Sequence, residues 1–162
     1  MADAVRLLYG KGRRRIAYIG PAGTDRVLNE HRFAGYLEGL DSVGIGRGNA
    51  LYESVHLSPQ DGYEGTLRLL DRETPDAIVA ANDNAAIGVL RALKERGLDV
   101  PGRVMLTGFD DSDAAAFLEP SLTTFSVPAE ELGRFAAKII VDRCMNERDC
   151  PIRISIPYTL IE

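Results

Sequence analysis

Short apolar runs alternate with segments of helical periodicity, and this alternation restricts the fold more than any other feature of the chain. The runs cover residues 15–20, 52–57, 76–81 and 104–109. Nearly continuous apolar runs of this length are typical of strands that are covered on both faces. Between them, apolar residues recur at spacings of three and four, which predicts helices. The helical positions are Phe33, Tyr36, Leu37, Leu40, Tyr63, Leu67, Leu70, Ala86, Val89, Leu90 and Leu93.

The order of these segments predicts an α/β fold. Strands that alternate with helices form a parallel sheet, and right-handed crossovers place the helices on both of its faces. We therefore expect a three-layer, Rossmann-like parallel sheet. The length of 162 residues suits one domain, and the content of 45% apolar and 27% charged residues is that of a globular protein. No apolar run approaches the roughly 20 residues that cross a membrane.

The pattern changes after Pro120. Residues 122–127 are extended in character, and Pro128 is well placed to open a helix with Glu130 and Glu131 in its first turn. Isoleucine alternates with polar residues over 152–156, which predicts a half-exposed or edge strand. The apolar stripe of the expected helix is Leu132, Phe135, Ala136, Ile139, Ile140 and Cys144.

The cysteines and histidines do not suggest a metal site or a disulfide framework. There are two of each, Cys144 and Cys150 with His31 and His56, and a zinc site needs about four ligands. We expect no metal and no cofactor, with both thiols reduced. The first 15 residues carry an acid before a short apolar patch and bases after it, the reverse of a secretory signal. A cytoplasmic location is expected.

Polar side chains follow the third and fourth expected strands. Asn82, Asp83 and Asn84 come after one strand, and Asp110 and Asp111 come after the other. Ligands of open parallel sheets bind beyond the carboxyl ends of the strands, so these residues belong to the edge where a site is expected. Some of them must cap helices. One residue of each adjacent pair can do so while the other faces the edge.

We consider several kinds of binding or catalytic site at this edge. The glycine-rich segment 44–48 precedes a strand, so it is a loop and not a dinucleotide fingerprint, and neither a P-loop nor a nucleophile elbow is present. Asp83, Asp110 and Asp111 could hold Mg²⁺ in a phosphoryl-transfer enzyme. Amides and carboxylates with an arginine, here Arg32, are the groups that bind the hydroxyls of sugars or nucleosides.

The only basic run, residues 11–15 (KGRRR), is more simply a turn between a helix and a strand than a phosphate contact. The net charge of −5 also argues against non-specific nucleic-acid binding by this chain.

Four segments, taken together and in order, resemble the effector-binding region of the LacI/GalR family of bacterial transcription regulators. They are GRRRIAYIGP (12–21), RFAGY (32–36), PDAIVAANDNAAIGVLRALKERGLDVPGRVMLTGFDDS (75–112) and EPSLTTFSVPAEELGRFAA (119–137). The resemblance runs from about residue 2 to residue 162. It implies a periplasmic-binding-protein-like fold, in which two α/β subdomains flank a ligand cleft.

The resemblance implies a division of the chain into three parts. Residues 1–121 correspond to the C-terminal effector-binding subdomain, and residues 122–150 to a crossover and a helix that normally packs on the N-terminal subdomain. Residues 151–162 correspond to a returning strand. The first subdomain and the DNA-binding helix-turn-helix lie outside this match. We therefore expect half a cleft and weak effector binding.

The same resemblance implies a ligand-sensing role. Effector contacts carry over to Arg32, Asn82 and Asp110, and Asp83 becomes the expected helix cap. The effector would be a small sugar or nucleoside-like molecule, no catalytic residue is implied, and DNA would be bound only through the absent helix-turn-helix. An exported sugar-binding protein of the same fold is the first alternative, and the Mg²⁺-dependent enzyme is the second.

The resemblance also implies a homodimer. The matching interface positions are Ile87, Leu90, Arg91, Lys94, Phe117 and Leu118. The apolar stripe of the last helix would lack its usual cover, because the first subdomain is absent. An exposed apolar stripe tends to be buried, so we expect a second copy of the chain to cover it, or the helix to dock differently.

Overall fold

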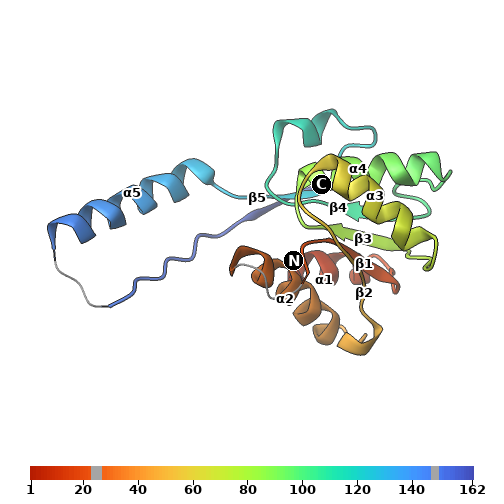
Figure 1. Ribbon diagram of the computed structural model, residues 1–162, viewed down its shortest axis with the longest axis horizontal. Coiled ribbons are helices and arrows are strands. Elements are labelled where there is room, and N and C mark those ends of the chain that lie inside the picture. The colour runs from red at the N-terminus through yellow and green to blue at the C-terminus, as the bar shows by residue number, and fades with distance from the viewer. Residues whose placement is uncertain (23–26, 147–149) are drawn as a thin grey trace.

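The computed structural model describes residues 1–22, 27–146 and 150–162 (Figure 1). The strands are β1 (Ile16–Gly20), β2 (Leu51–Ser54), β3 (Ala77–Ala80), β4 (Met105–Thr107), β5 (Thr124–Ser126) and β6 (Thr159–Ile161). The α-helices are α1 (Ala2–Gly10), α2 (Val27–Ser42), α3 (Pro59–Leu70), α4 (Asp83–Glu95) and α5 (Ala129–Met145). Two short 3₁₀ helices are η1 (Arg47–Asn49) and η2 (Asp113–Phe117).

The main sheet has the strand order β2-β1-β3-β4, and each of its neighbouring pairs is parallel. In the register, Tyr18 lies opposite Tyr52 on one side and Val79 on the other. An isolated parallel bridge between Thr107 and Thr123 places the segment leading into β5 beside β4. All carboxyl ends of β1 to β4 therefore meet at one edge of the sheet, as the alternation of segments predicts.

The sheet is covered on both faces, which confirms the three-layer prediction (Figure 1). Successive strand residues point to opposite faces. Tyr18 packs with Tyr36 in a core formed with α1 and α2, whereas Ile19 packs with Val89 in a core formed with α3 and α4. Strands buried on both faces need apolar residues at every position, and all five residues of β1 are buried.

Helix ends follow the local signals in the sequence. The side chain of Ser58 accepts the backbone N–H of Asp61, and Pro59 opens α3. The second strand ends at Ser54, earlier than the predicted residue 57. Gly97 has a positive φ of 68° directly after the cap residue of α4, which confirms the predicted helix stop.

The basic run at residues 11–15 forms the turn between α1 and β1, as predicted. Its guanidinium groups are not merely solvated. Arg13 donates from Nη2 to the carbonyl oxygens of residues 101 and 102, at 2.9 and 3.0 Å. The backbone N–H groups of Arg14 and Arg15 donate to the carboxylate of Asp76, at 2.8 and 2.9 Å. The run therefore closes the amino-terminal edge of the sheet.

The segment after β5 forms an arm that extends away from the sheet (Figure 1). The predicted helix is present as α5, directly after Pro128, and it buries no residue. Leu132 is 46% exposed and Ile140 is 63% exposed. A covering partner for this stripe stays a prediction.

The predicted strand over residues 152–156 is wrong. That segment lies outside any strand, and the returning strand is β6, which pairs antiparallel with β5. A strand needs a neighbour to bond its N–H and C=O groups. Within the described ranges, residues 152–156 lie beside no such neighbour.

Both cysteines, Cys144 and Cys150, are exposed free thiols. In the described part of the chain, no helix is long and apolar enough to span a membrane.

Candidate functional site

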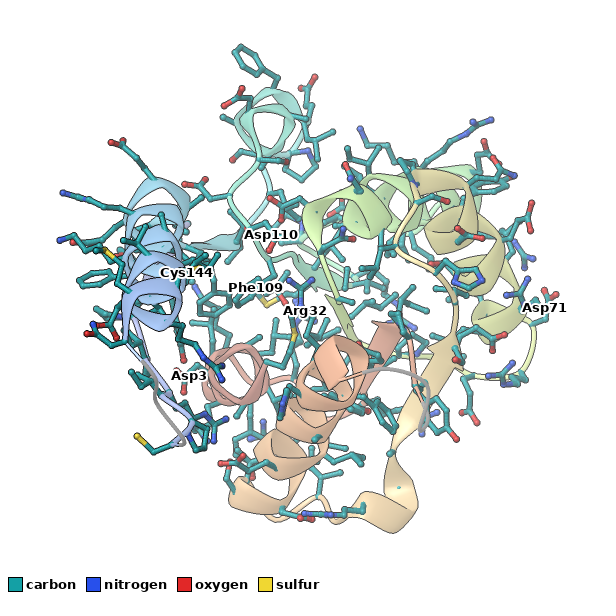
Figure 2. All side chains as sticks on the ribbon, turned by 60° about the vertical axis from the view of Figure 1, so that its left-hand side comes forward. Asp3, Arg32, Asp71, Phe109, Asp110 and Cys144 are labelled. Atoms are coloured by element: carbon teal, nitrogen blue, oxygen red, sulfur yellow. The ribbon has the colours of Figure 1, made fainter. Side chains whose placement is uncertain are left out.

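Three of the predicted site residues lie at the carboxyl edge of the sheet, and Figure 2 shows two of them, Arg32 and Asp110, facing each other. Asn82 follows β3, Asp110 follows β4, and Arg32 reaches the same edge from α2. Because β3 and β4 are neighbours in the sheet, their following loops lie side by side. We call Arg32, Asn82 and Asp110 the rim. The family resemblance predicted all three as effector contacts, which stays a prediction, and the topology places them on one edge.

Arg32 is held in place by contacts on three sides. Its Nη1 donates to the carbonyl oxygen of Ala81 at 2.7 Å, and its Nη2 donates to Oδ1 of Asp110 at 3.1 Å. Its guanidinium carbon lies 5.0 Å from the ring centroid of Phe109. A planar guanidinium fixed in this way loses little freedom when it binds a ligand. The side chain remains 28% exposed, so donors are still accessible.

Asp110 has an unusual backbone conformation. Its φ is 105°, and that of Asp111 is 55°, both in the region that non-glycine residues rarely adopt. Such conformations persist only where the surroundings impose them, and they concentrate at functional sites. The backbone N–H of Asp110 donates to the carbonyl oxygen of Phe125 at 3.1 Å. Its carboxylate, with a 46% exposed side chain, faces Arg32.

The pKa of the Asp110 carboxyl is raised above its ordinary value of 3.8. Burial is the main cause, and the nearby charge of Asp83 adds to it. Arg32 acts in the opposite direction without cancelling the effect. The ionised carboxylate is therefore held at the rim at a cost in free energy.

Replacing Asp110 with asparagine is expected to stabilise the free chain slightly at neutral pH. A carboxyl group with a raised folded pKa stabilises the fold when protonated, and that contribution is lost as the pH rises through the folded pKa. Asparagine removes the charge and tolerates a positive φ. Thermal unfolding should show a higher Tm for Asp110→Asn at about pH 7 and no difference near about pH 3. A lower Tm at neutral pH would contradict the role of burial.

Asn82 caps α4, and the expectation that Asp83 does so is wrong. The Asn82 Oδ1 accepts the backbone N–H of Ala85 at 2.9 Å. Its backbone is extended, with φ of −152° and ψ of 173°, which places the side chain over the first turn. Asn82 is only 8% exposed. Its amide nitrogen donates no hydrogen bond to the described residues and is the part that can reach a ligand.

Asp83 lies beneath the rim. It is 1% exposed, and its carboxylate accepts the N–H of Ser112 and the hydroxyl of Thr124, each at 2.7 Å. A Cβ on Gly108 would lie 2.2 Å from Asp83 Oδ1, so only glycine fits there. Sequence reasoning missed this role, because a carboxylate and an amide in adjacent positions are both good caps.

The Mg²⁺ site considered from the sequence does not form. Asp83 is buried and hydrogen-bonded, whereas Asp111 is exposed. Across residues 1–22, 27–146 and 150–162, no group of three or more histidine, cysteine or acidic side chains could hold a metal ion.

Comparisons with known proteins identify the family. The model of the periplasmic binding protein-like domain matches residues 5–162. The lactose operon repressor of Rhizobium radiobacter is 43% identical over 103 residues, which is 63% of this chain and 90% of that protein. The chain belongs to the LacI family of transcriptional regulators. The resemblance seen in the sequence is therefore confirmed, and so is the expectation that the chain is not an enzyme, since these relatives are repressors.

Other members of the LacI family match nearly the whole chain. The regulator CelR of Thermobifida fusca is 36% identical over 161 residues, covering 98% of this chain and 47% of CelR. A regulator from Enterococcus faecium with bound ribose has a TM-score of 0.86 at 29% identity, covering 99% of this chain and 59% of that one. A CelR–cellobiose complex has a TM-score of 0.87 at 33% identity, covering 98% and 48%. The chain spans about half the length of CelR.

Phe109 connects the rim of this LacI-family chain to its interior. The ring packs on Phe125, at 6.0 Å between centroids, and on Tyr158, at 6.3 Å. The hydroxyl of Tyr158 donates to the carboxylate of Asp3 on α1. Phe109 is half-buried, so it is more than a core residue: it supports Arg32 from below.

The residues predicted for a LacI-type dimer differ in exposure. Phe117 is 89% exposed, so it is not a core residue, whereas Leu90 is 5% exposed and belongs to the core between the sheet and α4. Leu118 is partly buried against that core, and Ile87 is partly buried on α4. Arg91 and Lys94 are exposed on the same helix.

Proposed function

We propose that the rim binds the hydroxyl groups of a small sugar or nucleoside-like effector, and that this chain is the sensing part of a longer regulator. The observation that carries the proposal is the Arg32–Asp110 pair, held at 3.1 Å at the carboxyl edge. Arginine donates to hydroxyl oxygens, the carboxylate accepts from hydroxyl groups, and the Asn82 amide donates. The ribose and cellobiose held by two related structures support this class of ligand.

In a longer regulator, this chain would supply one wall of a closed cleft. We propose that residues 1–121 form that wall and that residues 122–150 and 151–162 connect it to the rest of the protein. Effector binding would then favour one arrangement of the two walls and change the affinity of a separate segment for DNA, with equal and reciprocal coupling. Repressor relatives favour this role, in the cytoplasm, over that of an exported sugar-binding protein.

A titration followed by ¹H–¹⁵N NMR tests the proposal. Ribose, cellobiose and adenosine are added separately to the chain. Because a single wall leaves much of a ligand exposed, we expect weak binding, on the order of millimolar Kd. The shifting signals should include those of the rim residues. The absence of any rim shift with all three compounds would contradict the rim assignment, and micromolar binding would contradict the single-wall argument.

We propose that the chain dimerises through α4 and η2. Large exposed apolar side chains tend to mark interaction surfaces, and Phe117 on η2 is 89% exposed. Arg91 and Lys94 are exposed on α4. Since Leu90 is buried, it would support this surface from below. Ile87 completes the apolar part of the surface.

Changing Ile87 and Phe117 together to aspartate is expected to convert a dimer into a folded monomer. Two buried, unpaired charges oppose association, whereas in the single chain Ile87 is partly exposed and Phe117 is exposed. Sedimentation velocity measures the mass, and circular dichroism checks the fold. The matched control is Val141→Asp on α5, where valine is 58% exposed. If the control alone dissociates the dimer, the copies meet through α5 and the assignment to α4 is wrong.

A further inference from the structure

The loop that carries Asp110 cannot hold its own shape. Residues 108–112 connect β4 to η2, and both Asp110 and Asp111 have positive φ. A non-glycine residue leaves this region unless other contacts impose it. Few bonds lie within the loop itself, so the constraint must come from neighbouring elements. The contacts that surround the loop show which residues these are.

The constraint comes from a buried carboxylate and a buried hydroxyl. Oδ2 of Asp83 accepts the N–H of Ser112 at 2.7 Å, and Oδ1 accepts the hydroxyl of Thr124 at 2.7 Å. The same Thr124 oxygen accepts the N–H of Asp111 at 3.3 Å. Asp83 is 1% exposed and Thr124 is 0% exposed. Two successive N–H groups after Asp110 are therefore bonded to one buried pair.

Backbone hydrogen bonds hold the loop on the other side of Asp110. The N–H of Asp83 donates to the carbonyl oxygen of Phe109 at 2.9 Å, and the N–H of Asp110 donates to that of Phe125 at 3.1 Å. Each residue from 109 to 112 thus makes a hydrogen bond to α4 or to β5. Hydrogen bonds to buried groups are strong in a medium of low dielectric constant, so these bonds hold the loop firmly.

The same network connects the rim to the strand that leads out of the domain. Thr124 is the first residue of β5, and Asp110 forms a parallel bridge with Ser126, its last. The chain then runs through Pro128 into α5, which extends away from the sheet (Figure 1). A displacement of β5 would therefore move the bonds that hold Asp110.

We propose that Asp83 and Thr124 are positioning residues: they hold Asp110 in the conformation that faces Arg32, and they couple it to β5. The inference deepens the proposed function, on which it rests, by naming residues that set the geometry of the rim without touching the ligand. Effector binding at Asp110 and movement of β5 would then depend on each other.

The test replaces Thr124 with valine and measures the pKa of Asp110 by ¹³C NMR of its carboxyl group, without any ligand. Valine has the shape of threonine but no hydroxyl. The charged groups that act on Asp110 are Arg32 on α2 and Asp83 on α4, and both stay in place. If the loop relaxes, Asp110 loses both its contact with Arg32 and part of its burial, so the pKa of its carboxyl should differ from that of the natural chain.

Two variants control this result. Thr107→Val is the matched control, because Thr107 is 1% exposed on β4 and its hydroxyl has no hydrogen-bond partner among the described residues. It should leave the pKa of Asp110 unchanged. Thr124→Ser restores the hydroxyl and should restore the pKa of the natural chain. If Thr124→Val does not fold, the smaller Thr124→Ala serves in its place.

One outcome overturns the inference. If Thr124→Val or Thr124→Ala lowers the Tm while the Asp110 pKa stays that of the natural chain, the network only stabilises the fold. Because the measurement needs no effector, it is independent of the sugar titration. Failure of that titration would reject the proposed function and leave the positioning result standing.

Discussion

Replacing Arg32 with methionine is expected to abolish detectable effector binding. Methionine keeps an unbranched apolar stem that can lie on Phe109, but it loses the donors to Asp110 and to the ligand. Truncating one partner of a hydrogen-bonded charge pair costs about 2–5 kcal/mol in binding, which is roughly 30-fold or more. Starting from weak binding, the rim signals should stay unchanged in the NMR titration with ribose, cellobiose and adenosine.

Two further variants make the Arg32 result specific. Arg47→Met changes an exposed arginine of η1 that pairs with Asp41 and lies away from the rim. This variant should bind the ligands as the natural chain does. Arg32→Lys keeps the charge but lacks the planar fork, so it should bind with intermediate affinity. An Arg32→Met variant with unchanged binding would show that the ligand contacts another part of the surface.

Replacing Gly88 with alanine is expected to cause the largest loss of stability of any small substitution proposed for this chain. A Cβ at residue 88 would lie 1.9 Å from the carbonyl oxygen of Pro59 and 2.5 Å from the nitrogen of Tyr63. Both are backbone atoms of α3, so no side-chain rotation relieves the overlap and the helices must separate. Overpacking of this kind costs about 3 kcal/mol or more. Urea unfolding should show the loss in the free energy of unfolding.

Gly133→Ala is the matched control for Gly88→Ala. Gly133 also lies inside a helix, but a Cβ there would meet nothing within 4 Å. Alanine should favour the helical state of α5 by about 0.5–1 kcal/mol. If Gly88→Ala were as stable as the natural chain, the close packing of α3 on α4 would not limit stability.

Local signals predicted most of the fold and part of the rim. Apolar runs predicted β1 to β4, and β1 and β3 are buried at every position as strands covered on both faces are, whereas β2 at the edge of the sheet is not. The period of three and four predicted α2 to α4. Strand ends in a parallel sheet also locate a site without any tertiary contact. This rule placed Asp110 and Asp111 at the edge, whereas the choice of Asp110 and of Arg32 as effector contacts came from the family resemblance and stays a prediction. The position of Arg32 on a helix was equally compatible with a solvated charge.

The helix cap was assigned to Asp83, whereas Asn82 caps α4 and Asp83 is buried beneath the rim. Both side chains can cap a helix, and the sequence contains no local signal that separates them. Asp83 is buried because the hydroxyl of Thr124, 41 positions away, donates to its carboxylate and because Gly108 has no Cβ to overlap with that carboxylate. Only the folded chain brings these groups together.

The sequence by itself determined the layered α/β architecture, the family and the edge of the sheet where Asp110 lies, because periodicity and strand ends are local properties. The tertiary structure decided which polar residue is buried, that Leu90 is covered while Phe117 is exposed, and that residues 152–156 form no strand. These outcomes depend on contacts between residues far apart in the chain. Local propensity does not specify them, because the same side chain can be buried or exposed depending on which distant residues pack against it.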